Sequence, residues 1–208
     1  MREILIYSSF RSERLFYITN ILFHKLLGGQ VELTTNLEYF QYAKVAKLNY
    51  SARKLETKAI WMIPHPLLQE RKIVAQNIIV RYENSIPFFF NTAHETDVTS
   101  DLFAASFYLL TRYEEYLAYE ADEHGRFPAH QSLAYKAGFL ERPIVQEWAV
   151  YLSRKLQQLF PELEVNLPPY RFQPTFDIDV AWAYRHRIWQ RQLGAIGREL
   201  LQVNFRAL

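Results

Sequence analysis

The chain has 208 residues, of which 50% are hydrophobic and 16% aromatic, so it carries enough apolar surface for a folded core and is not a disordered chain. Its formal charge of +2 comes from interleaved basic and acidic side chains, so no basic stretch indicates a nucleic-acid interface. No apolar run is long enough to cross a bilayer, and the absence of cysteine excludes disulfides and cysteine–zinc sites. The N-terminal segment lacks a signal-peptide core. We expect a cytoplasmic protein that binds neither nucleic acid nor membrane.

The first part of the sequence predicts a strand followed by a helix. Glu3 to Tyr7 are typical of a strand, and Ser12 can cap a helix whose apolar residues recur at helical spacing until Gly28. Further strand-like runs, bounded by Asn, Pro and charged residues, are Gln30–Thr35, Ala59–Pro64, Asn77–Tyr82 and Ile86–Phe90. This pattern indicates a mixed sheet.

Two longer helices are expected next, from Asp101 to Tyr116 and from Pro143 to Phe160, where proline suits the first turn. The proline-bearing segment that follows resembles a linker, and a new strand is expected from Tyr170 to Val180. The sequence therefore predicts an α/β domain, a mixed sheet flanked by helices, with a domain boundary near residue 168.

Two carboxylates, Asp177 and Asp179, end the apolar run QPTFDIDVAW. In parallel α/β folds the loops at the carboxyl ends of strands carry the chemistry, so such a pair can hold a metal ion or act as a base. Spacing alone leaves open a metal-dependent deacetylase, a phosphotransferase with an aspartate nucleophile, and a nucleotide-sugar transferase whose DxD pair binds a divalent ion. It also leaves open two solvated or helix-capping aspartates at a strand end.

The segment TFDID resembles the first motif of the polysaccharide deacetylase (NodB-like) family. The blocks DLFAASFYLLTRYEEY, DEHGRF, FLERPIVQEW and FDIDVAWAYRHR make residues 101–187 similar to a bacterial subgroup with an additional N-terminal domain. The resemblance implies that Asp177 is the catalytic base that activates a metal-bound water and that Asp179 is a metal ligand. It also implies a divalent metal, zinc as first choice, and metal-assisted removal of acetyl groups from a glycan substrate.

The family completes its metal site with a His-x-x-x-His pair, whereas His186 is the one histidine after Asp179 in this chain. Its fold is a distorted (β/α) barrel, and residues 169–208 are long enough for only one strand and one helix. We therefore expect residues 1–168 to be an N-terminal accessory domain and residues 169–208 an incomplete barrel fragment, truncated, noncatalytic and without bound metal in this chain. The alternatives are a noncatalytic α/β domain for substrate positioning or assembly, and a fragment of a DxD glycosyltransferase.

The segment after the DxD pair carries an apolar stripe at helical spacing, which would face the rest of a barrel. Its members are Trp189, Leu193, Ile196 and Leu200. We expect this stripe to be buried either against the N-terminal domain or in a homodimer through residues 170–208, with the dimer as first choice.

We expect several other polar residues to have structural rather than functional roles. His65 lies between two prolines and is expected in a turn. The run TAHETD is expected to precede a helix capped by Thr99 or Ser100, although its histidine and acids are also metal-ligand types. Arg112 and Glu115 are expected to pair at i,i+3 on a helix surface, rather than to form a polar binding face.

Overall fold

The computed structural model describes residues 3–92, 95–167 and 169–177. The chain divides into two units, Met1–Pro169 and Tyr170–Leu208. The expected barrel fragment falls mostly on residues 178–208, outside the described residues. The described start of the second unit, residues 170–177, forms no strand, although a strand was predicted there. A single strand gains hydrogen bonds only from a paired neighbour, which sequence periodicity cannot supply.

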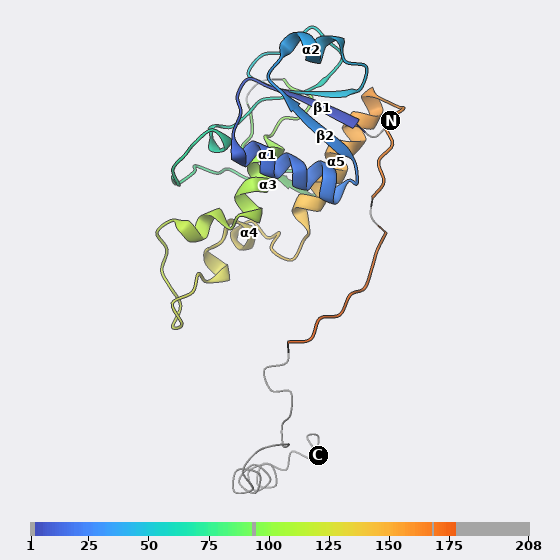
Figure 1. The fold of residues 1–208 in the computed structure, drawn as a ribbon. Coiled ribbons are helices and arrows are strands. Elements are labelled where there is room, and N and C mark those ends of the chain that lie inside the picture. Colours follow the sequence, from blue (N-terminus) through green and yellow to red (C-terminus); the bar gives the residue numbers. More distant parts are fainter. Residues whose placement is uncertain (1–2, 93–94, 168, 178–208) are drawn as a thin grey trace, which may run out of the picture. The chain divides into compact units, whose positions relative to one another are not determined.

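The first unit contains a four-stranded parallel sheet in the order β2-β1-β3-β4 (Figure 1). Its strands are β1 (Glu3–Ser8), β2 (Gln30–Thr34), β3 (Ala46–Tyr50) and β4 (Ile60–Met62). All five residues of β3 are buried, as expected for a strand covered on both faces. Parallel pairing brings the carboxyl ends of these strands to one edge of the sheet.

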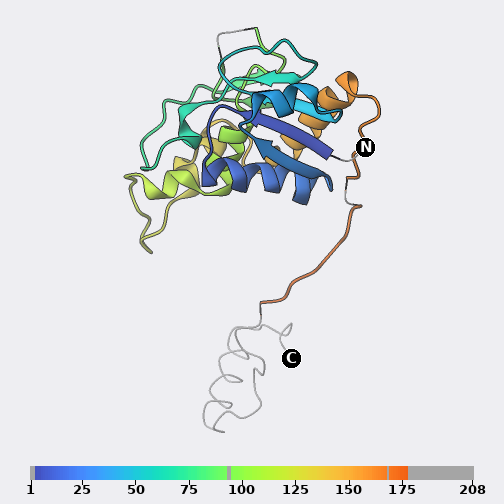
Figure 2. The same ribbon diagram turned by 45° about the horizontal axis from the view of Figure 1, so that its top comes forward.

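Helices cover both faces of the sheet. Figures 1 and 2 show the strands between α1 (Glu13–Thr19) and α2 (Leu37–Tyr42). Ser12 caps α1 as predicted, because its hydroxyl accepts a hydrogen bond from the Leu15 N–H. The same helical segment continues as a π-helix, Asn20–Leu26.

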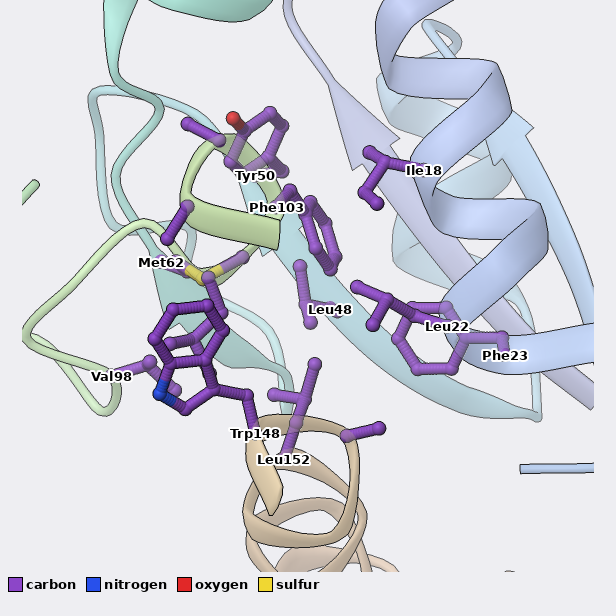
Figure 3. Close-up of a cluster of buried hydrophobic side chains, with 14 of the residues drawn as sticks. Ile18, Leu22, Phe23, Leu48, Tyr50, Met62, Val98, Phe103, Trp148 and Leu152 are labelled. Atoms are coloured by element: carbon purple, nitrogen blue, oxygen red, sulfur yellow. The ribbon is translucent and has the colours of Figure 1, made fainter. Parts of the chain in front are cut away.

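Two further helices, α3 (Leu102–Leu110) and α5 (Ile144–Leu159), pack with α1 and the π-helix. Large buried side chains from these helices meet β3 in one apolar cluster (Figure 3). Labelled members include Leu22, Phe23, Leu48, Phe103, Trp148 and Leu152. Burial of such side chains contributes about 1.5–3 kcal/mol each, so this cluster is the main source of the domain's stability.

A separate antiparallel hairpin joins β5 (Arg81–Glu83) to β6 (Ile86–Phe88). Its two turn residues, Asn84 and Ser85, both have positive φ, which suits a tight hairpin turn. Trp148 of α5 holds the hairpin, since its Nε1–H donates to the Pro87 carbonyl oxygen at 2.8 Å.

The remaining described elements are short. They are 3-10 turns at Pro66–Leu68, Tyr113–Tyr116 and Ala129–Gln131, and α4 (Leu133–Lys136). Within the described ranges, no helix is long and apolar enough to cross a membrane.

The predicted α/β class, with a sheet flanked by helices, is confirmed. Parallel and antiparallel pairings both occur, but in separate sheets. The sequence did not predict β3 or α2. The helix expected from Asp101 to Tyr116 ends at Leu110, because Arg112 adopts a left-handed backbone with φ 52°. Of the strand expected at Asn77–Tyr82, only the last two residues belong to β5.

The cap of α3 is Asp101, whose carboxylate accepts from two N–H groups of the first turn, and neither Thr99 nor Ser100 takes that place. Asp101 directly precedes the first helical residue, and a cap must stand there to reach the free N–H groups.

Candidate functional site

The predicted catalytic residue Asp177 lies at the end of the described chain, in an exposed irregular segment. The predicted metal ligand Asp179 lies outside the described residues. Among the described residues, no three His, Asp or Glu side chains are grouped so that they could hold a metal ion. A zinc site needs at least three protein ligands, so the described residues do not form one. The roles of Asp177 and Asp179 stay predictions.

A buried carboxylate, Asp101, lies where the carboxyl end of the parallel sheet meets the start of α3. Its Oδ2 accepts from the Tyr50 hydroxyl and from the His65 N–H, both at 2.6 Å. Its Oδ1 accepts from the N–H groups of Phe103 and Ala104, both at 3.0 Å. Burial raises the pKa of Asp101 to about 6, although the four hydrogen bonds lower it.

These four bonds connect three segments: the end of β3, the loop after β4 and the first turn of α3. Asp101 is 1% exposed, and both carboxylate oxygens accept two hydrogen bonds from the protein. It therefore has no free oxygen with which to bind a metal or a substrate proton. Its role is to position the loop that carries His65.

His65 forms the expected turn and also lines a cavity. Its Nδ1 accepts a hydrogen bond from the Leu67 N–H at 3.3 Å, which caps the following 3-10 turn. Since Nδ1 is the acceptor, the proton of the neutral ring is on Nε2. Burial lowers the pKa of His65, while the nearby Glu70 carboxylate acts in the opposite direction. The neutral ring is therefore the form present at neutral pH.

Phe90 holds the imidazole from one side. The two rings are stacked, with centroids 4.0 Å apart and planes 19° from parallel. Phe90 has φ 56°, a left-handed conformation that is unusual for a bulky side chain. The Asp101 N–H donates to the Phe90 carbonyl oxygen at 3.0 Å, which helps to hold this conformation. Strained backbone of this kind persists only where surrounding contacts impose it, and it is frequent at functional sites.

The His65 cavity, of about 180 Å³, lies beside these two rings. Its lining is His65, Asn77, Ile79, Arg81, Phe90 and Asn91. The Asn91 amide is held by two hydrogen bonds, because Nδ2 donates to the Ile79 carbonyl oxygen and Oδ1 accepts from the Ser100 hydroxyl. The lining therefore combines a fixed imidazole and an arginine with two amide side chains.

A larger cavity of about 510 Å³, the α3–α5 cavity, lies between the end of α3 and the start of α5. Its walls are mostly apolar and include Leu109, Phe127 and Pro143, which come from three of the blocks that resemble the deacetylase subgroup. Two of the charged groups at its edge pair with each other. Arg112 contacts Glu115 at 2.5 Å, which confirms the predicted i,i+3 pair, although it lies in a 3-10 turn.

The other charged groups of this cavity are also engaged. Glu114 accepts from the Leu133 N–H at 2.7 Å, and burial raises the pKa of its carboxyl. Arg142 pairs with Glu147 and donates to the Ser85 carbonyl oxygen. These groups fasten the loops around α5, so they leave few polar groups with which to recognise a ligand.

Residues 4–161 match the model of a family described as a family of unknown function (DUF7033). The chain belongs to the DUF7033 family. No curated protein and no solved structure shows a significant match to it. The DUF7033 region covers the parallel sheet, Asp101 and both cavities, and it ends before Asp177.

His65 lies in a turn, as the sequence predicts, but the site around it was not predicted. The position of Asp101 directly before an apolar helical run was a readable cap signal. No sequence pattern joins His65, Asn77, Arg81 and Asn91, which come from separate segments that only the folded chain brings together.

Proposed function

We propose that this protein is the N-terminal region of a metal-dependent carbohydrate deacetylase, in which a noncatalytic α/β domain precedes the first strand–helix unit of the catalytic domain. The observation that carries the proposal is the TFDID motif, which lies beyond the DUF7033 region and in the second unit of the chain. In the first unit, the buried carboxylate at the sheet edge, Asp101, is fully engaged in holding loops.

In the complete enzyme, a zinc ion would supply Lewis-acid activation of water, Asp179 would be one of its ligands and Asp177 the base. The substrate would be an acetylated glycan. We also propose that the protein is cytoplasmic and forms a homodimer through residues 170–208. The second candidate is a noncatalytic domain that positions a substrate or mediates assembly, and the His65 cavity favours it. A DxD glycosyltransferase fragment is the third.

The proposed roles of the two aspartates can be separated in the protein that the entire reading frame encodes. Loss of a ligand weakens zinc binding, whereas loss of the base leaves it nearly intact. We expect Asp179→Asn to raise the zinc Kd at least about tenfold and Asp177→Asn to change it less than about threefold. Isothermal titration with zinc measures both, with Glu56→Gln as an exposed control far from the motif in sequence. Equal zinc affinities in all four proteins would contradict the proposal, and metal-dependent consumption of a nucleotide sugar would favour the glycosyltransferase.

A further inference from the structure

The lining of the His65 cavity includes four residues whose side chains can donate hydrogen bonds, His65, Asn77, Arg81 and Asn91. The Nδ1 of His65 accepts from the Leu67 N–H, so the second ring nitrogen, Nε2, carries a proton. The stack with Phe90 and the hydrogen bond at Nδ1 hold the ring, and the bond from the backbone N–H of His65 to Asp101 holds the loop that carries it. Because the imidazole is already held in place, its side chain loses little conformational entropy when a ligand binds.

Arg81 adds the positive charge. Arg81 is an exposed residue of the cavity lining, and it forms no ion pair with any residue in the described part of the chain. The nearby carboxylates have other partners: Glu83 contacts the Thr99 hydroxyl at 3.4 Å, and Glu70 accepts from the Gln76 amide at 3.1 Å. An unpaired guanidinium beside a fixed donor matches the oxygen atoms of a phosphate or carboxylate group.

The size of the cavity limits the ligand. A volume of about 180 Å³ accepts a phosphate or carboxylate group with a few further atoms, but not a whole nucleotide or disaccharide. Asn77 and Asn91 line the same space and can bond to remaining oxygen or hydroxyl groups. The cavity also lies just beyond the carboxyl end of β4, the edge at which parallel α/β sheets usually bind ligands.

We propose that the His65 cavity binds a small oxyanion, the phosphate or carboxylate group of a metabolite or sugar, between the imidazole Nε2–H of His65 and the guanidinium of Arg81. This inference concerns the first unit only and does not depend on the deacetylase proposal.

The test uses the whole chain, titrated with inorganic phosphate and, separately, with acetate, in a buffer without other oxyanions. Proton–nitrogen NMR follows the ring nitrogens of His65 and the Nε–H of Arg81, and calorimetry gives the Kd. We expect saturable binding of at least one probe with shifts at both side chains. Phosphate alone would identify a phosphate site, acetate alone a carboxylate site, and both a general oxyanion site.

Three variants assign the binding. Arg81→Gln is expected to raise the Kd at least about tenfold, while Arg154→Gln, which removes the same charge from the exposed side of α5, changes it less than about twofold. His65→Asn keeps a capping oxygen for the Leu67 N–H but removes the Nε2–H, and it is expected to weaken binding with backbone chemical shifts changed only for residues near position 65. The proposal is overturned if neither probe saturates, or if Arg81→Gln and Arg154→Gln weaken binding equally.

Discussion

Replacement of Asp101 by asparagine tests the buried hydrogen-bond network directly. The amide oxygen of asparagine can keep the two bonds from the Phe103 and Ala104 N–H groups, because asparagine is a good helix cap. The amide nitrogen then takes the place of Oδ2, where the Tyr50 hydroxyl can turn to accept from it. The His65 N–H cannot turn, so it loses its acceptor.

Two effects of opposite sign determine the size of this change. A buried N–H without an acceptor costs about 1–3 kcal/mol at every pH. Asparagine also removes the cost of ionising a buried carboxyl. The pKa of Asp101 is raised from 3.8 to about 6, which corresponds to about 3 kcal/mol.

The sign of the pH dependence follows from this raised pKa. As the pH rises above about 4, the unfolded chain loses its proton first, so ionisation favours unfolding until Asp101 itself ionises near pH 6. The contribution that stabilises the wild type is therefore present below pH 4 and is lost between about pH 4 and pH 6. The asparagine side chain does not ionise, so the variant does not lose stability in this range. The amount by which the variant is less stable than the wild type should therefore decrease by about 3 kcal/mol between pH 4 and pH 7.

Urea unfolding followed by circular dichroism at pH 4, 5, 6 and 7 measures the difference between wild type and variant. Tyr50→Phe is the companion variant, because it removes a hydrogen bond that lowers the pKa of Asp101. It should shift the loss of stability to higher pH. A difference between wild type and Asp101→Asn that stays constant across this range would refute the reasoning, since the four donors would then fully offset the effect of burial on the pKa of Asp101.

Three further predictions concern the core and the second unit. Trp148→Phe should lower the unfolding free energy, measured by urea unfolding, by about 1–3 kcal/mol, because the buried Pro87 carbonyl loses its donor. An unchanged value would show that this hydrogen bond contributes no net stability. Asp177→Asn should change the unfolding free energy by less than about 0.5 kcal/mol, so a melting shift of many degrees would assign this exposed residue a structural role. Light scattering after size exclusion should find a dimer for the whole chain and a monomer for a chain ending at residue 168; two monomers would exclude a dimer through residues 170–208.

The sequence predicted the elements whose patterns are simple and missed those that tertiary contacts impose. Strand β1 is a short continuous apolar run and helix α5 has clear helical periodicity, and both form close to the expected bounds. Strand β3 has the sequence AKLNY, and its lysine and asparagine interrupt the apolar pattern from which a fully buried strand is predicted. Lys47 is tolerated there because its Nζ donates to the Gln41 carbonyl and to the Thr57 hydroxyl, both at 2.9 Å. Such partners cannot be read from one short segment.

The candidate site was less predictable than the fold, for a physical reason. Asp101 contacts the His65 N–H across 36 residues of sequence, and Phe90 adopts a left-handed backbone without being glycine. Contacts between distant segments, not local preference, hold both residues. Asp177 and Asp179 could be proposed from the sequence because two aspartates after an apolar run form a compact local pattern, and their roles stay predictions.

Acetate release is the measurement that tests the proposed function most directly. The protein encoded by the entire reading frame is incubated with acetylated chito-oligosaccharides, with zinc or with a chelator, and acetate is quantified. We expect zinc-dependent release that Asp177→Asn lowers by about 10²–10⁴-fold, the usual contribution of a general base, and no release above blank from the 208-residue chain alone. Release that Asp177→Asn leaves unchanged, or clear turnover by the 208-residue chain, would contradict the proposal that this chain is a noncatalytic domain joined to the start of a deacetylase.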